Sequence, residues 1–440
     1  MFFEGKRRVL SKILTATLFA ALLISSPTQS MAADDDDSCD LPGSGTVSDP
    51  WEIDSAADML EIGMDDCIST FDSSHHYELT SDVQLSGTWT PIELKSTSGT
   101  SFDGNGYTIS GLSVNKTGDS AALFATISSS EETAEVKDLF IESTGVAGSG
   151  NFVGALTAVT QNATITNVHA YVDGDVSGVQ QVGGLIGKLD AGSTVTNSSV
   201  HVVGTVSATG AYSAGGIGSL EGVVNGLYVN ADVSVSSSSG GGIGGGAIGQ
   251  WIPSSASAAQ LKGVSYVGNL SAEQYVGGLI GYVFAYSATN LVIEDSSVIG
   301  NVAGDAGSAI GSFIGRSGSN ISTVTVNDSY SSASFTRGGS AYTPALVRNN
   351  TGTITTSNVL YDSTKSSYTA TGTATAKTTG NLRSKQTFVD EGWSIQDVAN
   401  HDAGSPTDWL IDAVDGRNNG YPMNTFQLTP NVQDRPVSVS

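Results

Sequence analysis

The chain has 440 residues, of which 43 are acidic and only 18 are Lys or Arg, so its formal net charge is −25. A surface that binds duplex nucleic acid needs clustered Lys and Arg, so this composition argues against a nucleic-acid partner. Gly supplies 54 residues and aromatic residues only 7%, which favours short β-strands and tight turns and excludes an ordinary helical bundle.

The first 32 residues have the pattern of a secretory signal peptide. Basic residues within positions 6–12 precede an apolar run over 13–24, and Ser30-Met31-Ala32 matches a small-residue cleavage site. A membrane anchor is the alternative, but the run is shorter than the roughly 20 residues that a membrane helix needs. We therefore predict a secreted or cell-surface protein without membrane insertion.

Residues 33–100 are predicted to form an N-terminal cap with one disulfide bond. Cys39 and Cys67 are the two cysteines, and an even pair in an exported chain indicates a disulfide. Such a bond would stabilise the cap by about 3–4 kcal/mol. The acidic run Asp34–Asp37 is interpreted as a solvated tail, with structural calcium as the alternative, and no other cofactor is predicted. One short helix is expected over 54–62.

Residues 101–362 contain a repeat of about 32 residues. A block of small and apolar residues, clearest as Gly183-Gly184-Leu185-Ile186-Gly187, recurs along this region. It begins at residues 121, 154, 183, 215, 245, 277, 311 and 344. Between these blocks, apolar and polar residues alternate with the period of two that is typical of strands.

The repeat predicts an all-β solenoid of about eight coils. A unit this short cannot bury its apolar face alone, whereas stacked units can. A β-propeller is the alternative, but its blades usually run to about 40–50 residues. Because an open solenoid end exposes unpaired strand edges, caps are expected at both ends. We assign 363–380 to a Thr/Ala/Gly-rich connector and 381–440 to a C-terminal cap and tail.

Several segments resemble secreted bacterial proteins that are built from the GLUG motif. The blocks Gly183–Gly187 and Gly277–Gly281 resemble the core of that motif, and Phe102–Gly106 resembles the start of the repeat region. Asp408–Ile411 and Gly420–Pro422 resemble the closing segment, so the likeness covers roughly residues 46–426. It implies a right-handed parallel β-helix with an adhesin-like role and no shared catalytic residues. The blocks depart from the motif at Ala121, Ala155, Ser312 and Pro344.

Two outward-facing columns of side chains are predicted from a recurring turn residue, Gly or Ala, in each unit. The residues three positions before it are Tyr171, His201, Tyr228, Ser265, Ser297 and Tyr330. The residues directly after it are Asp175, Thr205, Asp232, Asn269, Asn301 and Ser334. Coils stack about 4.8 Å apart, so each set should form a continuous column, with about 13 Å between the two columns.

An aromatic column beside an acid and amide column could bind a glycan, because rings stack on sugar faces and polar groups bond to hydroxyls. The ligand-binding residues predicted on this basis are Tyr171, His201, Tyr228, Tyr330, Asp175, Asp232, Asn269 and Asn301. A simpler interpretation is that Tyr and Thr favour exposed strands and that Asn side chains stack on one another. A contact with another protein is the third interpretation.

A polysaccharide lyase or hydrolase is the alternative function, because β-helices also carry such enzymes. A lyase needs a base near a calcium-binding carboxylate cluster, and between residues 121 and 315 the basic residues are Lys137, Lys188 and Lys262. A hydrolase needs two facing carboxylates, and Glu294 and Asp295 should point to opposite faces of a strand. The five histidines show no metal-binding spacing. We predict no catalytic and no metal-binding residues.

Ice binding by a flat threonine column is a further alternative. Thr351–Thr356 and Thr369–Thr379 are rich in threonine, but neither segment is expected to repeat at the coil period. The sequence therefore predicts a secreted binding or structural β-helix, adhesin-like, whose partners are cell-surface or extracellular glycans or proteins.

Overall fold

The computed structural model describes residues 40–62, 74–238, 241–253, 259–348, 352–368, 373–401, 409–412 and 417–428. The described residues belong to one compact unit that begins at Cys39. The predicted signal peptide at 1–32, the acidic run Asp34–Asp37 and both Cys39 and Cys67 lie outside the described residues.

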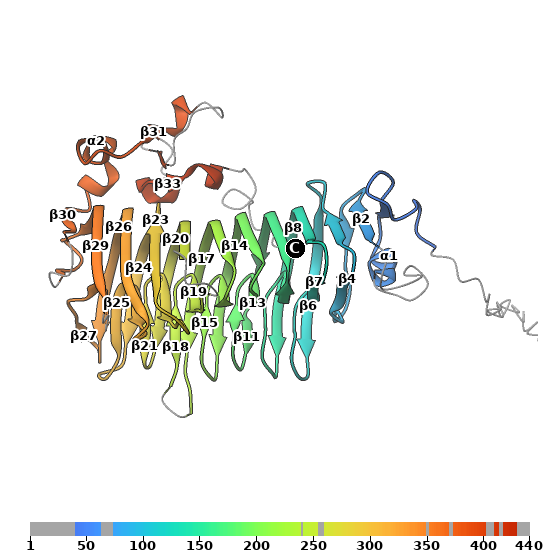
Figure 1. The fold of residues 1–440 in the computed structure, drawn as a ribbon, viewed down its shortest axis with the longest axis horizontal. Helices are drawn as coiled ribbons and strands as arrows, with labels where there is room; N and C mark the ends of the chain where they lie inside the picture. Colours follow the sequence, from blue (N-terminus) through green and yellow to red (C-terminus); the bar gives the residue numbers. More distant parts are fainter. Residues whose placement is uncertain are drawn as a thin grey trace, which may run out of the picture. The chain divides into compact units, whose positions relative to one another are not determined.

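Most of the described chain forms two long sheets of parallel strands that run along a solenoid (Figure 1). The first sheet contains β1 (Trp51–Ile53), β2 (His75–Leu79), β3 (Val83–Gln84), β5 (Thr100–Asp103), β6 (Thr108–Lys116), β8 (Ala134–Gly148), β10 (Ala163–Val172), β11 (Val176–Gly178), β14 (Thr194–Ala208), β17 (Val223–Val235), β20 (Ala259–Ala272), β23 (Thr289–Glu294), β24 (Ser297–Gly304), β26 (Ile321–Arg337), β27 (Ser340–Ala341), β29 (Thr353–Asp362) and β30 (Thr375–Lys377). The second sheet contains β4 (Ile92–Ser96), β7 (Phe124–Ser129), β9 (Thr157–Gln161), β12 (Val182–Gly183), β13 (Ile186–Leu189), β15 (Ser213–Ala214), β16 (Ile217–Leu220), β18 (Ile243–Gly245), β19 (Ile248–Trp251), β21 (Tyr275–Gly277), β22 (Ile280–Val283), β25 (Ala309–Ser317) and β28 (Ala345–Val347).

Equivalent strands of successive coils pair in parallel, as the repeat predicted. In the first sheet Ala170 pairs with Val200, and Val200 pairs with Val229 in the next coil. In the second sheet Ile186 pairs with Ile217, which pairs with Ile248. The prediction of an all-β parallel solenoid of about eight coils is therefore confirmed, and the propeller alternative is wrong.

A corner in each coil is occupied by a residue with a positive φ angle. In successive coils these residues are Asp138, Asn167, Asn197, Gly226, Gly263, Asp295, Asp328 and Asn358. Asn, Asp and Gly adopt this left-handed conformation at lower cost than other residues. Adjacent side chains also bond to one another, since Asn358 Nδ2 donates to Asp328 Oδ1 at 2.8 Å. The corner therefore explains part of the Asn, Asp and Gly content of the repeat.

The interior of the solenoid is filled by aliphatic side chains of both sheets. Val200, Val202 and Val206 are buried, which confirms the predicted inward positions of the strand pattern. The glycine block lies where backbone segments approach closely. A Cβ atom added to Gly183 would lie only 2.1 Å from the carbonyl oxygen of Ile186. Its small residues therefore allow the second sheet to turn tightly against the core.

The N-terminal segment contains the expected helix, α1 (Ala56–Glu61), which Ser55 and Asp58 cap reciprocally. On either side of it, β1 pairs in parallel with β2, and β2 pairs with β5. The parallel ladder thus begins inside the segment predicted as a cap. No helix in the described parts of the chain has both the length and the apolar character of a membrane span.

The C-terminal segment, which comprises the described residues from 381 onward, packs on the outer side of the first sheet. It contains α2 (Lys385–Asp390) and a small sheet of β31 (Ile395–Asp397), β32 (Trp409–Ile411) and β33 (Met423–Asn424). Its aromatic residues share a second apolar cluster with solenoid residues. The cluster includes Ile299, Tyr330, Leu360, Leu382, Phe388, Trp393, Trp409 and Tyr421. In Figure 1 the segment lies beside the ends of β23, β26 and β29.

Candidate functional site

The predicted column of polar residues is present on the first sheet and is continuous. We call Asp175, Thr205, Asp232, Asn269, Asn301 and Ser334 the polar column. Thr205 pairs with Asp232, and Asn301 pairs with both Asn269 and Ser334. The side chains of Asp175, Asp232, Asn269 and Asn301 are exposed. The structure thus presents a regular series of carboxylate, amide and hydroxyl groups along successive coils.

Neighbouring members of the polar column are hydrogen-bonded. The backbone N–H of Thr205 donates to Asp175 Oδ1 at 2.8 Å, and that of Asn269 donates to Asp232 Oδ1 at 2.8 Å. Asn301 Nδ2 donates to Asn269 Oδ1 at 2.7 Å. These bonds stabilise the stacking of coils, as the simpler interpretation expected. Asn269 Nδ2 donates to both carboxylate oxygens of Asp232. Asn301 Nδ2 uses one of its two N–H donors in the column, so its second N–H is available to a ligand.

The predicted aromatic column is wrong in its register. Tyr171 and His201 are neighbours, with ring centroids 5.3 Å apart, but His201 pairs next with Asn230 and not with Tyr228. The cause is a register shift between Val202 and Thr205. Counting backward from the turn residue therefore misaligned this coil with the next one.

Tyr228 and Tyr330 belong to a neighbouring column that the C-terminal segment covers. Tyr228 pairs with Ser199 and Ser265, and the same column continues through Ser297 to Tyr330. Tyr228 is 5% exposed and Tyr330 is fully buried. The hydroxyl of Tyr330 donates to the carbonyl oxygen of Pro422 at 2.7 Å, and burial raises its pKa. These two tyrosines are therefore not open to a ligand, which corrects the prediction.

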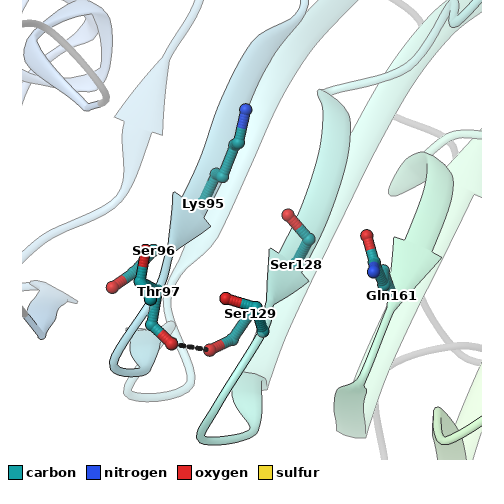
Figure 2. Close-up of a pocket in the computed structure, with 7 residues that line it drawn as sticks. Lys95, Ser96, Thr97, Ser128, Ser129 and Gln161 are labelled. Carbon is teal, nitrogen blue, oxygen red and sulfur yellow. Dashed lines mark hydrogen bonds between the residues drawn. The ribbon is translucent and has the colours of Figure 1, made fainter. Parts of the chain in front are cut away.

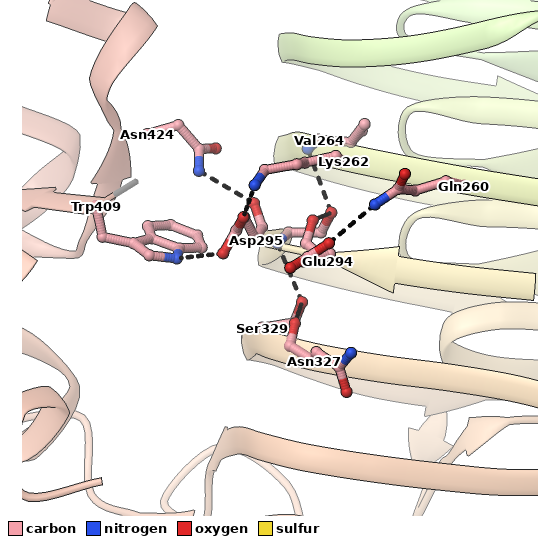
Figure 3. A network of polar contacts seen from close by, with 10 residues as sticks. Gln260, Lys262, Val264, Glu294, Asp295, Asn327, Ser329, Trp409 and Asn424 are labelled. Atoms are coloured by element: carbon pink, nitrogen blue, oxygen red, sulfur yellow. Dashed lines mark hydrogen bonds and ion pairs between the residues drawn. The ribbon is translucent and has the colours of Figure 1, made fainter. Parts of the chain in front are cut away.

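Asp295 holds the C-terminal segment on the first sheet, as Figure 3 shows. Trp409 Nε1 donates to Asp295 Oδ1 at 3.2 Å, and Asn424 Nδ2 donates to the Asp295 backbone carbonyl at 3.1 Å. Lys262 Nζ lies 3.1 Å from Asp295 Oδ2. Glu294 instead accepts a bond from Gln260 Nε2 at 2.9 Å. The adjacent acids therefore serve separate structural contacts.

Tyr171 and His201 are half-buried on the first sheet. Burial, with Asp173 and Glu142 nearby, raises the pKa of Tyr171, and burial lowers the pKa of His201. The Tyr171 hydroxyl has no hydrogen-bond partner among the residues that the structure describes. Two half-buried rings thus accompany the polar column at its Asp175 and Thr205 end, and the Tyr171 hydroxyl oxygen itself is buried.

The basic residues considered for a lyase are engaged in ion pairs. Lys137 Nζ lies 3.4 Å from Asp103 Oδ2, and Lys188 Nζ lies 3.1 Å from Glu221 Oε1. Lys262 binds Asp295, as described above. Across the described ranges, no group of three or more His, Cys, Asp or Glu side chains is placed to hold a metal ion.

Figure 2 shows a small polar pocket where β4, β7 and β9 end. Its volume is about 180 Å³, and it is lined by Lys95, Ser96, Thr97, Ser128, Ser129, Ser130 and Gln161. Ser129 Oγ donates to the Thr97 carbonyl oxygen at 3.2 Å. The lining thus combines serine and threonine hydroxyl groups with one lysine and one side-chain amide.

Threonine columns do occur at the coil period, contrary to expectation. Thr325 pairs with Thr355, and their hydroxyl oxygens lie 2.9 Å apart. Thr164 likewise pairs with Thr194. Between these pairs the column passes through other residue types, namely Val223, Gln260 and Val292. The threonines therefore form two separate patches and no continuous ice-binding face.

Sequence reasoning missed a group of aromatic residues on and beside the second sheet. Tyr275, Tyr282, Phe284 and Tyr286 lie in contact with one another, and Arg316 lies over the first two rings. The alternation in Tyr282-Val283-Phe284-Ala285-Tyr286, with its aromatic side chains on one face, could have indicated this group.

Comparisons with known proteins give little overlap with characterised families. No protein-family model matches the chain. The chain is 36% identical over 179 residues to halomucin of Haloquadratum walsbyi, a match that spans 36% of this chain but only 2% of halomucin. A solved structure from Bacteroides ovatus, named as a candidate immunoglobulin A1 protease, shares 18% identity and a TM-score of 0.49. The alignment covers 87% of this chain and 94% of that one.

Proposed function

We propose that this protein is an extracellular, non-catalytic binding and structural module, adhesin-like, that contacts extended glycan polymers along the polar column. The observation that carries the proposal is the unbroken register of that column from Asp175 to Ser334. The signal-peptide pattern at 1–32 and the resemblance to GLUG-motif proteins support an extracellular setting. The similarity to halomucin is consistent with that setting.

The geometry suits an extended ligand better than a compact one. Each coil repeats its polar group about 4.8 Å further along the solenoid, so a linear polymer can make the same weak contact many times. Contacts that are linked in this way strengthen one another without any single tight site. Carboxylate and amide groups can bond to sugar hydroxyls, and the rings of Tyr171 and His201 can stack on a sugar face.

A lyase or hydrolase on this scaffold is the alternative function. A lyase needs a base, and the three lysines that the sequence offered for that role, Lys137, Lys188 and Lys262, are each held by a carboxylate. We therefore favour binding without turnover.

The experiment compares polysaccharide binding by the chain from residue 33 onward with that of two variants. The first variant carries Tyr171→Ala and His201→Ala, and the second carries Asp232→Ala, Asn269→Ala and Asn301→Ala. Both should lose retention on a glycan array by at least about tenfold, which corresponds to about 1.4 kcal/mol.

A matched control carries Thr325→Ala and Thr355→Ala, which remove an exposed in-register pair from another column of the first sheet. This control should bind like the unmodified chain, and circular dichroism should show that all variants are folded. Equal binding by the control and both test variants, or no glycan binding at all, would overturn the proposal.

A further inference from the structure

The aromatic group of the second sheet combines several rings with one arginine. Tyr275 belongs to β21, Tyr282 to β22 and Arg316 to β25, and Tyr282 pairs directly with Arg316 in the next coil. Phe284 and Tyr286 follow β22 in the chain. The strands β21 and β25 are labelled in Figure 1. We call Tyr275, Tyr282, Phe284, Tyr286 and Arg316 the aromatic patch.

The rings of the aromatic patch form a row. Tyr275 and Tyr282 have centroids 5.5 Å apart, Tyr282 and Phe284 6.3 Å, and Phe284 and Tyr286 4.9 Å. The first two pairs are tilted by 34° and 36°, whereas Phe284 and Tyr286 meet edge to face. Tyr286 is 79% exposed, and the other three rings are half-buried. Val283, which lies between Tyr282 and Phe284 in the chain, is fully buried and points into the core. The two rings therefore lie on the outer face of the strand and do not fill the core.

Arg316 is positioned by the rings and not by an acid. Its guanidinium carbon lies 4.6 Å from the Tyr275 ring centroid and 5.9 Å from that of Tyr282. Among the residues that the structure describes, Arg316 forms no ion pair. This is notable in a chain with 43 acidic and 18 basic residues. A cation stacked on a ring keeps its N–H groups free to bind an anionic oxygen.

We propose that the aromatic patch is a binding site for an acidic saccharide, a sugar chain that carries carboxylate or sulfate groups. The row of rings supplies stacking surfaces for successive sugar rings. Arg316 supplies a planar, two-pronged donor for the acidic group, which is the pairing that guanidinium favours. The site is on the second sheet, whereas the polar column is on the first, so each can be tested without the other.

The experiment measures binding by isothermal titration calorimetry with three probes. These are an oligogalacturonate, a heparin-derived oligosaccharide and a neutral galacto-oligosaccharide of similar length. At least one acidic probe should bind, and it should bind more tightly than the neutral probe. Arg316→Gln and Tyr282→Ala should each weaken that binding by at least about tenfold, and raised salt should weaken it as well.

The control is Lys95→Gln, which removes the same charge from another exposed position of the second sheet. It should leave binding within about twofold of the unmodified chain, because long-range charge effects are screened by salt. Arg316→Lys keeps the charge but loses the planar fork, so it should bind less tightly than the unmodified chain. Circular dichroism spectra that match that of the unmodified chain should show that every variant is folded.

The proposal is overturned if neither acidic probe binds. It is also overturned if the neutral probe binds equally well, or if Lys95→Gln loses as much binding as Arg316→Gln. The variants of the polar column should leave these affinities unchanged, so a failure here is distinct from a failure of the proposed function.

Discussion

His169 is held by the first sheet in a way that disfavours its protonation. Its ring stacks on Phe140 with centroids 5.2 Å apart. Nδ1 lies 2.7 Å from Ser199 Oγ, and Nε2 lies 2.8 Å from Asn167 Oδ1. Burial lowers its pKa to about 4, although Asp138 acts in the opposite direction. The imidazole is therefore neutral at pH 7 and serves as packing.

Acid should destabilise the protein through His169. The unfolded chain takes up this proton near pH 6.5, while the folded chain takes it up only near pH 4. Stability is thus present above pH 6.5 and is lost as the pH falls toward 4, by up to about 3 kcal/mol. Denaturant unfolding at pH 7 and pH 4.5 should show a smaller loss for His169→Gln than for the unmodified chain. An NMR titration that placed the His169 pKa near 6.5 would contradict this explanation.

Asn197 shows what the left-handed corner requires. It is exposed and has a φ of 47°, so backbone conformation dominates the effect of a substitution. Asn197→Val should lower the free energy of unfolding by about 1–2 kcal/mol, because a β-branched residue resists positive φ. Asn197→Gly should cost less, since glycine accepts this conformation. Denaturant unfolding of both variants checks this, and a valine loss no larger than the glycine loss would refute the corner's role.

At the level of strands, the repeat predicted which segments pair but not every register. The alternation around Val200, Val202 and Val206 placed the core side correctly. It could not reveal the shift between Val202 and Thr205, because a bulge preserves the alternation on each side of it. The prediction of the polar column was correct because Thr205 and Asp232 lie directly after the shift. The predicted aromatic column was wrong because His201 lies before the shift.

The C-terminal segment shows the second limit of sequence reasoning. The sequence predicted a cap and tail over residues 381–440, but not that this segment would cover Tyr330 on the side of the solenoid. The bond from Tyr330 to Pro422 joins residues 92 positions apart, and the contact of Trp409 with Asp295 spans 114 positions. Such contacts depend on the packing of finished elements and leave no local periodic pattern.

Removing the Tyr330 hydroxyl should loosen the C-terminal segment while the solenoid stays folded. Tyr330→Phe removes the 2.7 Å bond to the Pro422 carbonyl, which still accepts from Asn418 Nδ2 at 2.9 Å. The expected loss is therefore that of one hydrogen bond, about 0.5–1.5 kcal/mol. Hydrogen exchange should then become faster in β32 and β33 but stay unchanged in β13 and β16. Tyr107→Phe, at a 37% exposed tyrosine, is the control. Uniformly faster exchange would show that the segment and solenoid unfold together.

For the whole molecule, the period of about 32 residues was sufficient to predict the architecture. Each coil contacts mainly its neighbours, so the same local pattern repeats and the fold follows from it. Function is harder to predict from the sequence, because the outer columns of side chains both stabilise the stacking of the coils and present polar groups to solvent. The bonds between Asp232, Asn269 and Asn301 are compatible with both roles. Only a binding measurement separates them.

The most direct test is to incubate the purified chain with a panel of soluble polysaccharides and to measure two quantities in the same sample. One is the fraction of polysaccharide that is retained with the protein, and the other is the number of new reducing or unsaturated ends. The proposed function predicts retention of at least one polysaccharide with no new ends, with or without calcium. Release of new ends, or the absence of any retention, would contradict it.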